Sequence, residues 1–332
     1  MKGEGMTTKQ VVLVGASGFW QWKAFLTEKC LPLRLRFEEK LIAPPKLNPF
    51  VWGLVAADQP IDGEFMDQYP NLKTIARTGT GYDAIDIAAA RERGVTVTRV
   101  AKLNAEAVSE FALAHILAHA KNLVAHHERM VRGEWNRVSS LRIADLVVGI
   151  VGLGTIGHAL ASTLHILGVR HLRGWNRTLR PDVRALAEST GLELATLDEV
   201  FTKSDVVVVA VALTPDTIGL VSRQLLMRMK PGALLVNICR GAVVDEQALA
   251  DIVYLGGVSA ALDVFSVEPP SGDVFRVPFM QKLRATERSR SRVLLSPHLA
   301  GKTTRSDELI AEQVARNLAG VWTGDLTDVE VV

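Results

Sequence analysis

The stretch Leu146-Val-Val-Gly-Ile-Val-Gly-Leu-Gly-Thr-Ile-Gly157 decides the fold of this chain. Its first half, Leu146–Val151, is a continuous apolar run, which is typical of a parallel strand buried on both faces. The residues from Thr155 to Leu167 have the pattern of a helix, so the stretch predicts a strand, a glycine-rich turn and a helix. Because this unit begins nearly halfway along 332 residues, another structural unit must precede it.

The three glycines of the turn have the spacing GxGxxG, and each has its own role in a dinucleotide site. Gly152 makes the tight turn, Gly154 lets the backbone approach a pyrophosphate, and Gly157 lets the helix pack closely on the strand. The helix N-terminus adds N–H donors and the positive end of a dipole. A simple packing turn can contain the same glycines, but the position between strand and helix favours the nucleotide site.

Composition narrows the class of protein. At 332 residues and 48% hydrophobic content, the chain is long and apolar enough for two α/β domains with full cores. The 38 Lys and Arg nearly balance the 36 Asp and Glu, without a basic stripe, so we do not expect nucleic acid as a partner. Cys30 and Cys239 lack CxxC spacing, and the first residues lack a signal-peptide core, so we expect a cytoplasmic protein without a membrane segment.

Strand and helix patterns alternate along the chain, which predicts two parallel-sheet units. The expected strands before the fingerprint are 11–14, 53–57, 73–76 and 95–98, and those after it are 170–175, 206–211, 233–238, 258–264 and 293–295. A helix over 84–93 ends at Gly94. The second unit is therefore predicted to be a doubly wound sheet of about six strands.

Two amphipathic helices flank this second unit. The first is predicted to start at Asn104 as N-cap, with an apolar stripe formed by Val108, Phe111, Ala112, Ile116 and Leu123. It can serve as a stiff hinge between the units. The second is predicted over 303–318, with a stripe formed by Leu309, Ile310, Val314 and Leu318, and it returns the chain to the first unit.

Three polar residues follow predicted strands, where doubly wound sheets bind their ligands. Arg240 follows one strand and has the donor fork that suits a carboxylate, Glu268 precedes two prolines in a loop, and His298 follows the last strand. Each taken alone could be a surface or structural side chain. Together they form a set in which a histidine moves a proton, a carboxylate stabilises its charged form, and an arginine binds a substrate carboxylate. With a nicotinamide at the fingerprint, this set suits hydride transfer to a 2-oxo acid.

At this point the chain resembles the D-isomer-specific 2-hydroxyacid dehydrogenases over almost its whole length. The motifs that carry the resemblance are Arg77-Thr-Gly-Thr-Gly-Tyr-Asp-Ala-Ile-Asp86, Val148-Gly-Ile-Val-Gly-Leu-Gly-Thr-Ile-Gly157, Met229-Lys-Pro-Gly-Ala-Leu-Leu-Val-Asn-Ile-Cys-Arg-Gly-Ala-Val-Val-Asp245, Ala261-Leu-Asp-Val-Phe265 with Glu268-Pro269, and Ser296-Pro-His-Leu-Ala-Gly301. Their shared order is far more specific than any one motif.

The resemblance implies roles for single residues. Arg240 is similar to the substrate-carboxylate ligand, His298 to the acid/base and Glu268 to its partner, so these three are the expected catalytic residues. Thr80 and Gly81 fall where backbone N–H groups of the family bind the substrate together with Arg240 and His298. The expected cofactor-binding residues are Gly152, Gly154, Thr155, Ile156, Gly157, Asn176, Arg177, Thr178, Leu213, Thr214, Pro215, Thr217, Cys239 and Asp263, the last receiving the nicotinamide carboxamide.

The resemblance also implies the domain organisation. A discontinuous substrate-binding domain is expected from residues 1–103 and 302–332, with an NAD(P)-binding Rossmann domain, 104–301, inserted into it. Both would be Rossmann-like or flavodoxin-like parallel-sheet domains. The family further implies a homodimer built through the cofactor domains and a cleft that closes over a small 2-oxo or 2-hydroxy acid.

Two departures from the family pattern affect function. Where an NAD enzyme carries an acid for the ribose 2′-OH, this chain has Asn176-Arg177-Thr178, so we expect NADP to be preferred over NAD. The span from Glu268 to His298 is longer than the family pattern and contains the basic stretch 282–292. This stretch either shapes substrate choice near the site or is an exposed excursion.

Other readings are less favoured. His115 and His119 are four residues apart but lack the HExxH glutamate, so we expect no metal, and Cys239 has no base beside it in sequence. Formate dehydrogenases resemble the chain but carry Gln in place of Glu268, and phosphite dehydrogenases carry Lys in place of Thr80. A nucleotide-sensing, corepressor-like protein of the same fold also remains an alternative. We predict a 2-oxoacid reductase with NADPH preference; glyoxylate, hydroxypyruvate, a phosphorylated hydroxyacid or a sugar acid all remain open as substrates.

Overall fold

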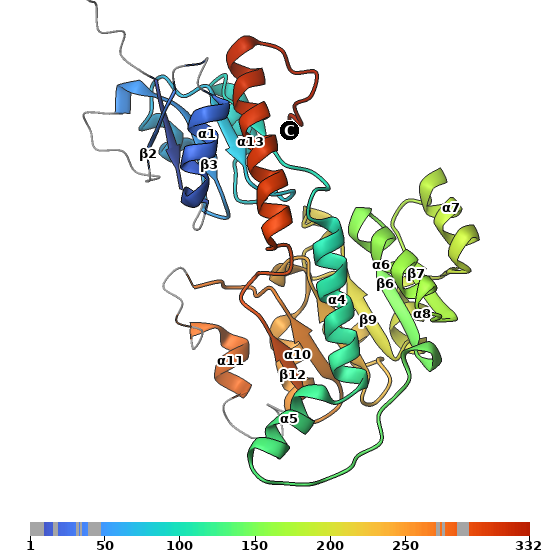
Figure 1. Ribbon diagram of the computed structural model, residues 1–332. Coiled ribbons are helices and arrows are strands. Elements are labelled where there is room, and N and C mark those ends of the chain that lie inside the picture. Colours follow the sequence, from blue (N-terminus) through green and yellow to red (C-terminus); the bar gives the residue numbers. More distant parts are fainter. Residues whose placement is uncertain are drawn as a thin grey trace, which may run out of the picture. The chain divides into compact units, whose positions relative to one another are not determined.

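The computed structural model places the described residues in two compact units, each with its own parallel sheet (Figure 1). The first unit is formed within residues 1–103 and by Thr303–Val332, and the second spans Asn104–Lys302. The residues that the structure describes are 10–15, 19–30, 33, 35–38, 48–269, 273, 276–283 and 292–332. Among them, no helix is both long and apolar enough to cross a membrane.

The first unit contains a five-stranded parallel sheet in the order β2-β1-β3-β4-β5, which is the flavodoxin-like order. Its strands are β1 (Val11–Val14), β2 (Arg36–Glu38), β3 (Val51–Ala56), β4 (Thr74–Arg77) and β5 (Thr96–Thr98). Its helices are α1 (Lys23–Lys29), α2 (Gly63–Asp67), α3 (Ile87–Glu92) and α13 (Thr304–Thr323). The three central strands are almost wholly buried, as continuous apolar runs require.

Helix α13 is part of this first unit although it lies some 200 residues further along the chain. Its stripe of Ile310, Val314 and Leu318 packs in one core cluster with β1 and β3, and Figure 1 shows the red helix beside α1. Its Trp322 ring meets the ring of Trp52 edge to face. Beyond the helix, Val331 forms an antiparallel bridge to Thr98, so the last residues extend the sheet next to β5.

The second unit contains a seven-stranded parallel sheet in the order β12-β11-β10-β9-β6-β7-β8, with the strand order reversing between β6 and β9 as in a Rossmann sheet. Its strands are β6 (Val147–Val151), β7 (His171–Trp175), β8 (Glu193–Leu194), β9 (Val206–Val209), β10 (Leu234–Asn237), β11 (Ser259–Leu262) and β12 (Val293–Leu295). Its helices are α4 (Ala105–Ala120), α5 (Leu123–Val131), α6 (Thr155–Ile166), α7 (Pro181–Thr190), α8 (Leu197–Lys203), α9 (Arg223–Leu226), α10 (Glu246–Tyr254) and α11 (Pro278–Leu283).

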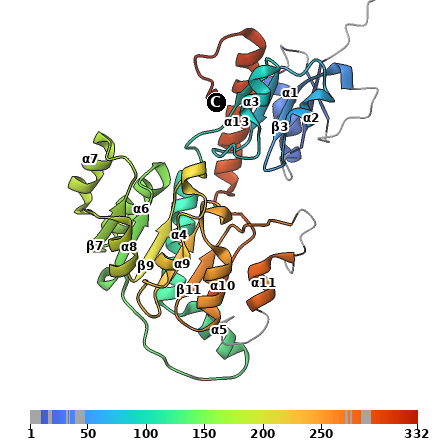
Figure 2. The ribbon, with the colours of Figure 1, turned by 180° about the vertical axis from the view of Figure 1, so that it is seen from behind.

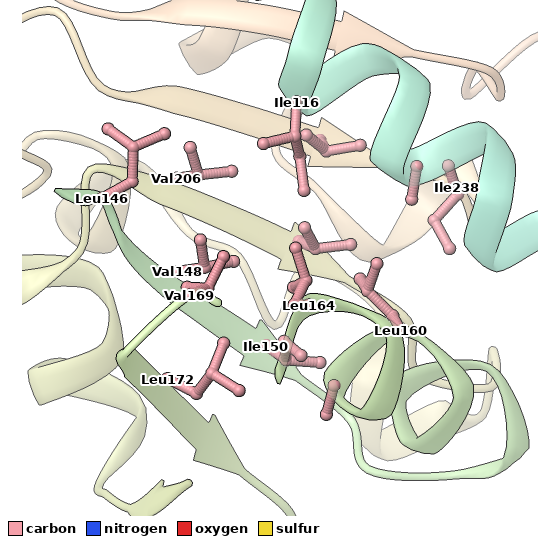
Figure 3. Packing of buried hydrophobic residues seen from close by; sticks show 14 of the residues in the cluster. Ile116, Leu146, Val148, Ile150, Leu160, Leu164, Val169, Leu172, Val206 and Ile238 are labelled. Atoms are coloured by element: carbon pink, nitrogen blue, oxygen red, sulfur yellow. The ribbon is translucent and has the colours of Figure 1, made fainter. Parts of the chain in front are cut away.

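Helices cover both faces of this sheet, so each face buries its own core. On one face α4 and α6 pack on the strands, and Figure 3 shows Ile116 and Leu160 from these helices meeting Val148, Ile150 and Val206. On the other face lie α8, α9, α10 and α11, which are labelled in the reverse view of Figure 2. Burying a Val, Leu or Ile side chain contributes about 1.5–3 kcal/mol, so these two clusters account for much of the unit's stability.

The expected strands are present, with each end within two residues of its expected position, and two more strands were missed. Both β2 and β8 lie at a sheet edge and are only three and two residues long, so they leave almost no pattern in the sequence.

The expected helix from Asn104 through Leu123 is wrong at its C-terminal end. Helix α4 ends at Ala120, Asn122 adopts a left-handed conformation with φ 49°, and α5 begins a new helix at Leu123. Asparagine tolerates this conformation better than most residues, which lets the chain turn. Leu123 is consequently 62% exposed and does not belong to the buried stripe of α4.

Candidate active site

The fingerprint glycines occupy the turn between β6 and α6, and their surroundings explain two of them. Gly152 has φ 100°, and a Cβ there would lie 2.7 Å from the carbonyl oxygen of Ala210 at the end of β9. A Cβ at Gly157 would overlap the carbonyl oxygen of Gly152, so the helix lies directly against the turn. A Cβ at Gly154 would meet nothing within 4 Å. The open space is therefore next to Gly154, at the N-terminus of the twelve-residue helix α6.

The first residues of α6, Thr155 and Ile156, bring their N–H groups to this open space, because the first turn of a helix has no internal acceptors for its donors. An anionic group such as a pyrophosphate is the natural occupant of such a position. The turn thus fits the dinucleotide that its sequence predicts.

The residues after β7 lie against the fingerprint. Asn176 Oδ1 accepts a hydrogen bond from Leu153 N at 2.9 Å, and its Nδ2 donates to Thr178 O at 2.7 Å. The next residue, Arg177, forms an exposed ion pair with Asp216, with 2.6 Å between Nη1 and Oδ2. A positive charge therefore stands where the ribose acid of NAD enzymes is expected, but a carboxylate from another loop accompanies it.

Asp216 belongs to a short 3-10 turn, Pro215–Thr217, that follows β9 at the same sheet edge. The turn is fixed internally: Thr217 Oγ1 accepts from Thr214 N at 2.8 Å and donates to Ala212 O at 2.7 Å. Leu213 packs against the core cluster beneath it. These expected cofactor-binding residues thus form a rigid turn.

The carboxyl ends of β10, β11 and β12 bring the other candidates to one edge of the sheet. Asn237, Leu262 and Leu295 are register partners on these three neighbouring strands. Arg240 follows the first of them, Asp263 and Glu268 the second, and His298 the third. The sheet therefore places all the expected second-unit residues of the site at its carboxyl edge.

His298 and Glu268 form a direct pair. His298 Nδ1 lies 2.8 Å from Glu268 Oε2, with side chains 31% and 36% exposed. Since a carboxylate only accepts, its proximity assigns the proton to Nδ1. The carboxylate fixes the orientation of the ring.

Two buried side chains hold the loops that carry these residues. Both carboxylate oxygens of Asp263, which is 1% exposed, accept hydrogen bonds: Oδ1 from Ser296 Oγ and Leu299 N, and Oδ2 from Ala300 N at 2.8 Å. Asn237, buried at the end of β10, donates to Arg240 O at 3.0 Å and accepts from Cys239 N. Asp263 thus anchors the loop around His298. Its expected contact to the nicotinamide carboxamide stays a prediction.

The remaining substrate candidates, Thr80 and Gly81, lie in the first unit, in the loop after β4. Thr80 Oγ1 donates to Val100 O at 3.1 Å, and Gly81 O accepts from Arg77 Nε at 2.8 Å. Within the described parts of the chain, neither backbone N–H of this pair donates to an acceptor. The loop therefore offers two donors of the kind that bind a carboxylate.

Other titratable candidates have structural surroundings. Burial raises the pKa of the Cys239 thiol to about 11, so the thiol stays protonated at neutral pH. Burial lowers the pKa of His115, and burial with the nearby Arg292 lowers that of His119. Among the described residues, no three His, Cys, Asp or Glu side chains are placed to hold a metal ion. Most of the basic stretch 282–292, namely 284–291, lies outside the described residues.

Asn237, Ser296 and Glu246 were not assigned a role in the site by the sequence analysis. Glu246 accepts a hydrogen bond from Ser266 N at 2.6 Å, within the loop that ends at Glu268. For Asn237, its position as a polar residue at the end of an apolar strand could have indicated a role in the site. The partners of the other two are 20 and 33 residues away in the chain.

The profile of the family described as "D-isomer specific 2-hydroxyacid dehydrogenase, NAD binding domain" matches residues 113–300. A curated relative, D-3-phosphoglycerate dehydrogenase of Mycobacterium leprae (strain TN), is 34% identical over 284 residues, which are 83% of this chain and 51% of the relative. The chain thus spans about half the length of the first such relatives. Glyoxylate reductase of Thermofilum pendens is 35% identical over 80% of this chain and 76% of its own.

Solved structures share the fold over nearly the full length of the chain. The NADPH-dependent glyoxylate/hydroxypyruvate reductase of Sinorhizobium meliloti, in complex with NADP and malonate, superposes with a TM-score of 0.80 at 26% identity. The match covers 98% of this chain and 97% of that one. From its profile match, its relatives and its two parallel-sheet units, the chain belongs to the D-isomer-specific 2-hydroxyacid dehydrogenase family.

Proposed function

We propose that this protein is an NAD(P)-dependent oxidoreductase that interconverts a 2-oxo acid and a D-2-hydroxy acid, working as a 2-oxoacid reductase with a preference for NADPH. The observation that carries the proposal is the 2.8 Å contact between His298 Nδ1 and Glu268 Oε2. Both residues follow strands whose carboxyl ends lie at the same sheet edge as the fingerprint turn, which supports a role of the pair in proton transfer.

Each residue of this pair has a distinct task. When bound, the nicotinamide supplies the hydride that reduces the substrate C2 carbonyl. His298 gives the proton that the carbonyl oxygen takes up, and Nε2 is the nitrogen for this transfer because Nδ1 contacts Glu268. Glu268 favours the protonated ring before the transfer and keeps its orientation afterwards.

The substrate carboxylate needs fixed donors. Arg240 provides a guanidinium at the end of β10, with its main chain held by Asn237 and its Nη1 donating to Cys239 O at 2.8 Å. The N–H groups of Thr80 and Gly81, in the loop after β4, are further donors that we propose for substrate binding. A carboxylate held by several charge-assisted and backbone bonds leaves C2 as the reacting carbon.

The NADPH preference rests on Arg177. No carboxylate at 176 to 178 would repel a 2′-phosphate, and Arg177 provides charge-assisted donors for it. The NADPH-dependent reductase of Sinorhizobium meliloti shows that the architecture accommodates NADP. The glyoxylate reductase relative suggests small 2-oxo acids as the substrate class.

We also propose a homodimer. The segment between α4 and β6 exposes a row of large apolar side chains, of which Trp135 is 80% exposed. The exposed members are Leu123, Val124, Met130, Val131, Trp135, Val138 and Leu141. Such a row on a polar surface is typical of an association site, and a second copy of this chain is the partner that the family implies. A cytoplasmic location fits the two free cysteines, Cys30 and Cys239.

A direct test is turnover with a panel of 2-oxo acids, including glyoxylate and hydroxypyruvate, with NADPH and NADH in parallel and nicotinamide absorbance as the readout. We expect substrate-dependent oxidation of NADPH that is faster than that of NADH. A protein that binds NADPH but turns over no 2-oxo acid would contradict the proposal and favour a regulatory role.

A further inference from the structure

Glu246 is a buried carboxylate for which the reaction itself has no use. It is the first residue of α10 and only 8% exposed. Its Oε2 accepts a hydrogen bond from Ser266 N at 2.6 Å. Its Oε1 is buried and accepts no hydrogen bond among the described residues. A buried, half-satisfied carboxylate costs folding free energy, so stability alone does not explain its presence.

The bond from Ser266 fixes an irregular segment, Val264–Glu268, that has no strand or helix of its own. This segment ends at Glu268, whose Oε1 accepts from Phe265 N at 3.3 Å and whose Oε2 contacts His298. Gly241 also packs so closely against the segment that an added Cβ would overlap the backbone of Phe265 and Ser266. The segment is therefore in direct contact with both Gly241 and the Glu246 carboxylate.

We propose that Glu246 is a positioning residue, which holds the Ser266 N–H so that Glu268, two residues further on, meets His298. The inference rests on the proposed roles of His298 and Glu268. It predicts that the length of the Glu246 side chain and its accepting oxygen matter, whereas its charge does not. A shift of about 1 Å in a catalytic group can lower turnover about 100-fold.

Two conservative variants separate these properties. Glu246→Gln keeps the length and an accepting oxygen but loses the charge, while Glu246→Asp keeps the charge and is shorter by one methylene, about 1.5 Å. We expect Glu246→Gln to retain kcat within about threefold and Glu246→Asp to lose about 10- to 100-fold. The Kd for NADPH should stay unchanged in both, since the fingerprint turn is elsewhere on the edge. The opposite order of the two variants would overturn the proposal.

Asp205 provides a matched control. Its Oδ2 also accepts a backbone N–H, from Val147 at 2.8 Å, but at the start of β6 and thus at the opposite edge of the sheet. We expect Asp205→Asn to leave kcat unchanged whatever its effect on the unfolding midpoint. If Glu246→Asp changes only the unfolding midpoint, with kcat unchanged, then Glu246 is structural and the proposal is wrong.

A double-mutant cycle with Glu268→Gln tests the route of the effect. If Glu246 acts through Glu268, then Glu246→Asp should lower kcat by less than about threefold in the Glu268→Gln background. An equal loss in both backgrounds would overturn the proposal. If His298→Ala retains full turnover, the proposed function is wrong, even where the Glu246 variants lose turnover. If His298→Ala loses turnover and Glu246→Asp does not, only the inference about Glu246 is wrong. If Glu246→Asp does not fold, Glu246→Gln decides, and a loss there of tenfold or more contradicts the inference.

Discussion

At the scale of single residues, the backbone of His298 is unusual. Its φ of 51° lies in the left-handed region, which costs a non-glycine residue about 1–2 kcal/mol. Hydrogen bonds to one buried residue offset this strain. His298 N donates to Asp263 O at 2.7 Å, and the N–H groups of the next two residues donate to the Asp263 carboxylate. The loop is therefore held by its main chain, and the imidazole can be removed without releasing it.

We predict that His298→Ala lowers kcat about 100- to 10,000-fold, because general acid assistance contributes that much to rate. NADPH affinity should change little, since the loop keeps its Asp263 bonds. Steady-state kinetics and fluorescence titration with NADPH measure the two effects. His165→Ala, in the last turn of α6, is the control and should keep full activity. A near-normal kcat for His298→Ala would show that another group supplies the proton.

Replacing Glu268 by glutamine should shift the pH profile of reduction toward acid. The carboxylate stabilises the protonated ring, so without its charge the ring loses its proton at lower pH and the acid form becomes depleted near neutrality. The high-pH limb of kcat/KM should move to lower pH.

The control for this experiment is Glu199→Gln. The Lys203 ammonium and the Thr196 N–H and hydroxyl hold the pKa of Glu199 at about 2, so it titrates far below the measured range. The control profile should match wild type. If the Glu268→Gln profile also matches wild type, Glu268 is not the partner of the proton-transferring group.

At the scale of elements, the sequence was most informative about buried strands. A parallel strand covered on both faces is expected to be apolar, so β1, β6 and β9 leave unbroken apolar runs. The end of α4 could not be predicted, because the apolar pattern resumes at Leu123 after only two polar residues, and the left-handed conformation of Asn122 that breaks the helix leaves no sequence pattern of its own.

The residues of the candidate site also differ in how far the sequence could predict them. Residues directly after strands, such as Arg240 and His298, were expected because parallel strands collect their carboxyl ends at one edge. Glu246 and Asp216 were not expected, since their partners are 20 and 39 residues away and only the folded chain brings them together. Long-range side-chain pairing has no local signal in one sequence.

Cofactor choice depends on two loops, because Arg177 after β7 and Asp216 after β9 meet at the carboxyl edge of the second sheet. We predict that Asn176→Asp combined with Arg177→Gln raises the ratio of kcat/KM for NADH over NADPH about 10- to 150-fold, since charge-assisted bonds contribute about 1.5–3 kcal/mol. Asp216→Asn should move the ratio in the opposite direction by removing a charge that repels the 2′-phosphate.

The control for cofactor choice is Arg223→Gln, because Arg223 also pairs with an aspartate, Asp251, at 2.7 Å but from helix α9. It should leave the ratio unchanged. A wild-type enzyme that prefers NADH, or a double variant with an unchanged ratio, would refute the assignment of Arg177.

At the scale of the whole molecule, the apolar row between α4 and β6 predicts association. Replacing Val131 by Asp and Trp135 by Ser should convert a dimer into a monomer, because both side chains would lose a buried environment. Light scattering after gel filtration gives the mass. Ile166→Ser, at a side chain that is 81% exposed on α6, should leave the dimer intact. A monomeric wild type would disprove the dimer.

The contribution of α13 to the first unit has a consequence for how the chain acquires its structure during synthesis. Residues 104–302 form a contiguous unit whose contacts can close as soon as it leaves the ribosome. The first unit cannot complete its contacts at that stage. Its β1 and β3 residues share a core with Ile310, Val314 and Leu318, and Thr98 of β5 pairs with Val331, so these contacts form only after the C-terminal residues are synthesised. The part of the first unit before residue 104 is thus synthesised before the second unit but completed after it. Its apolar strands depend on late, long-range contacts, which form slowly and leave nascent chains prone to aggregation.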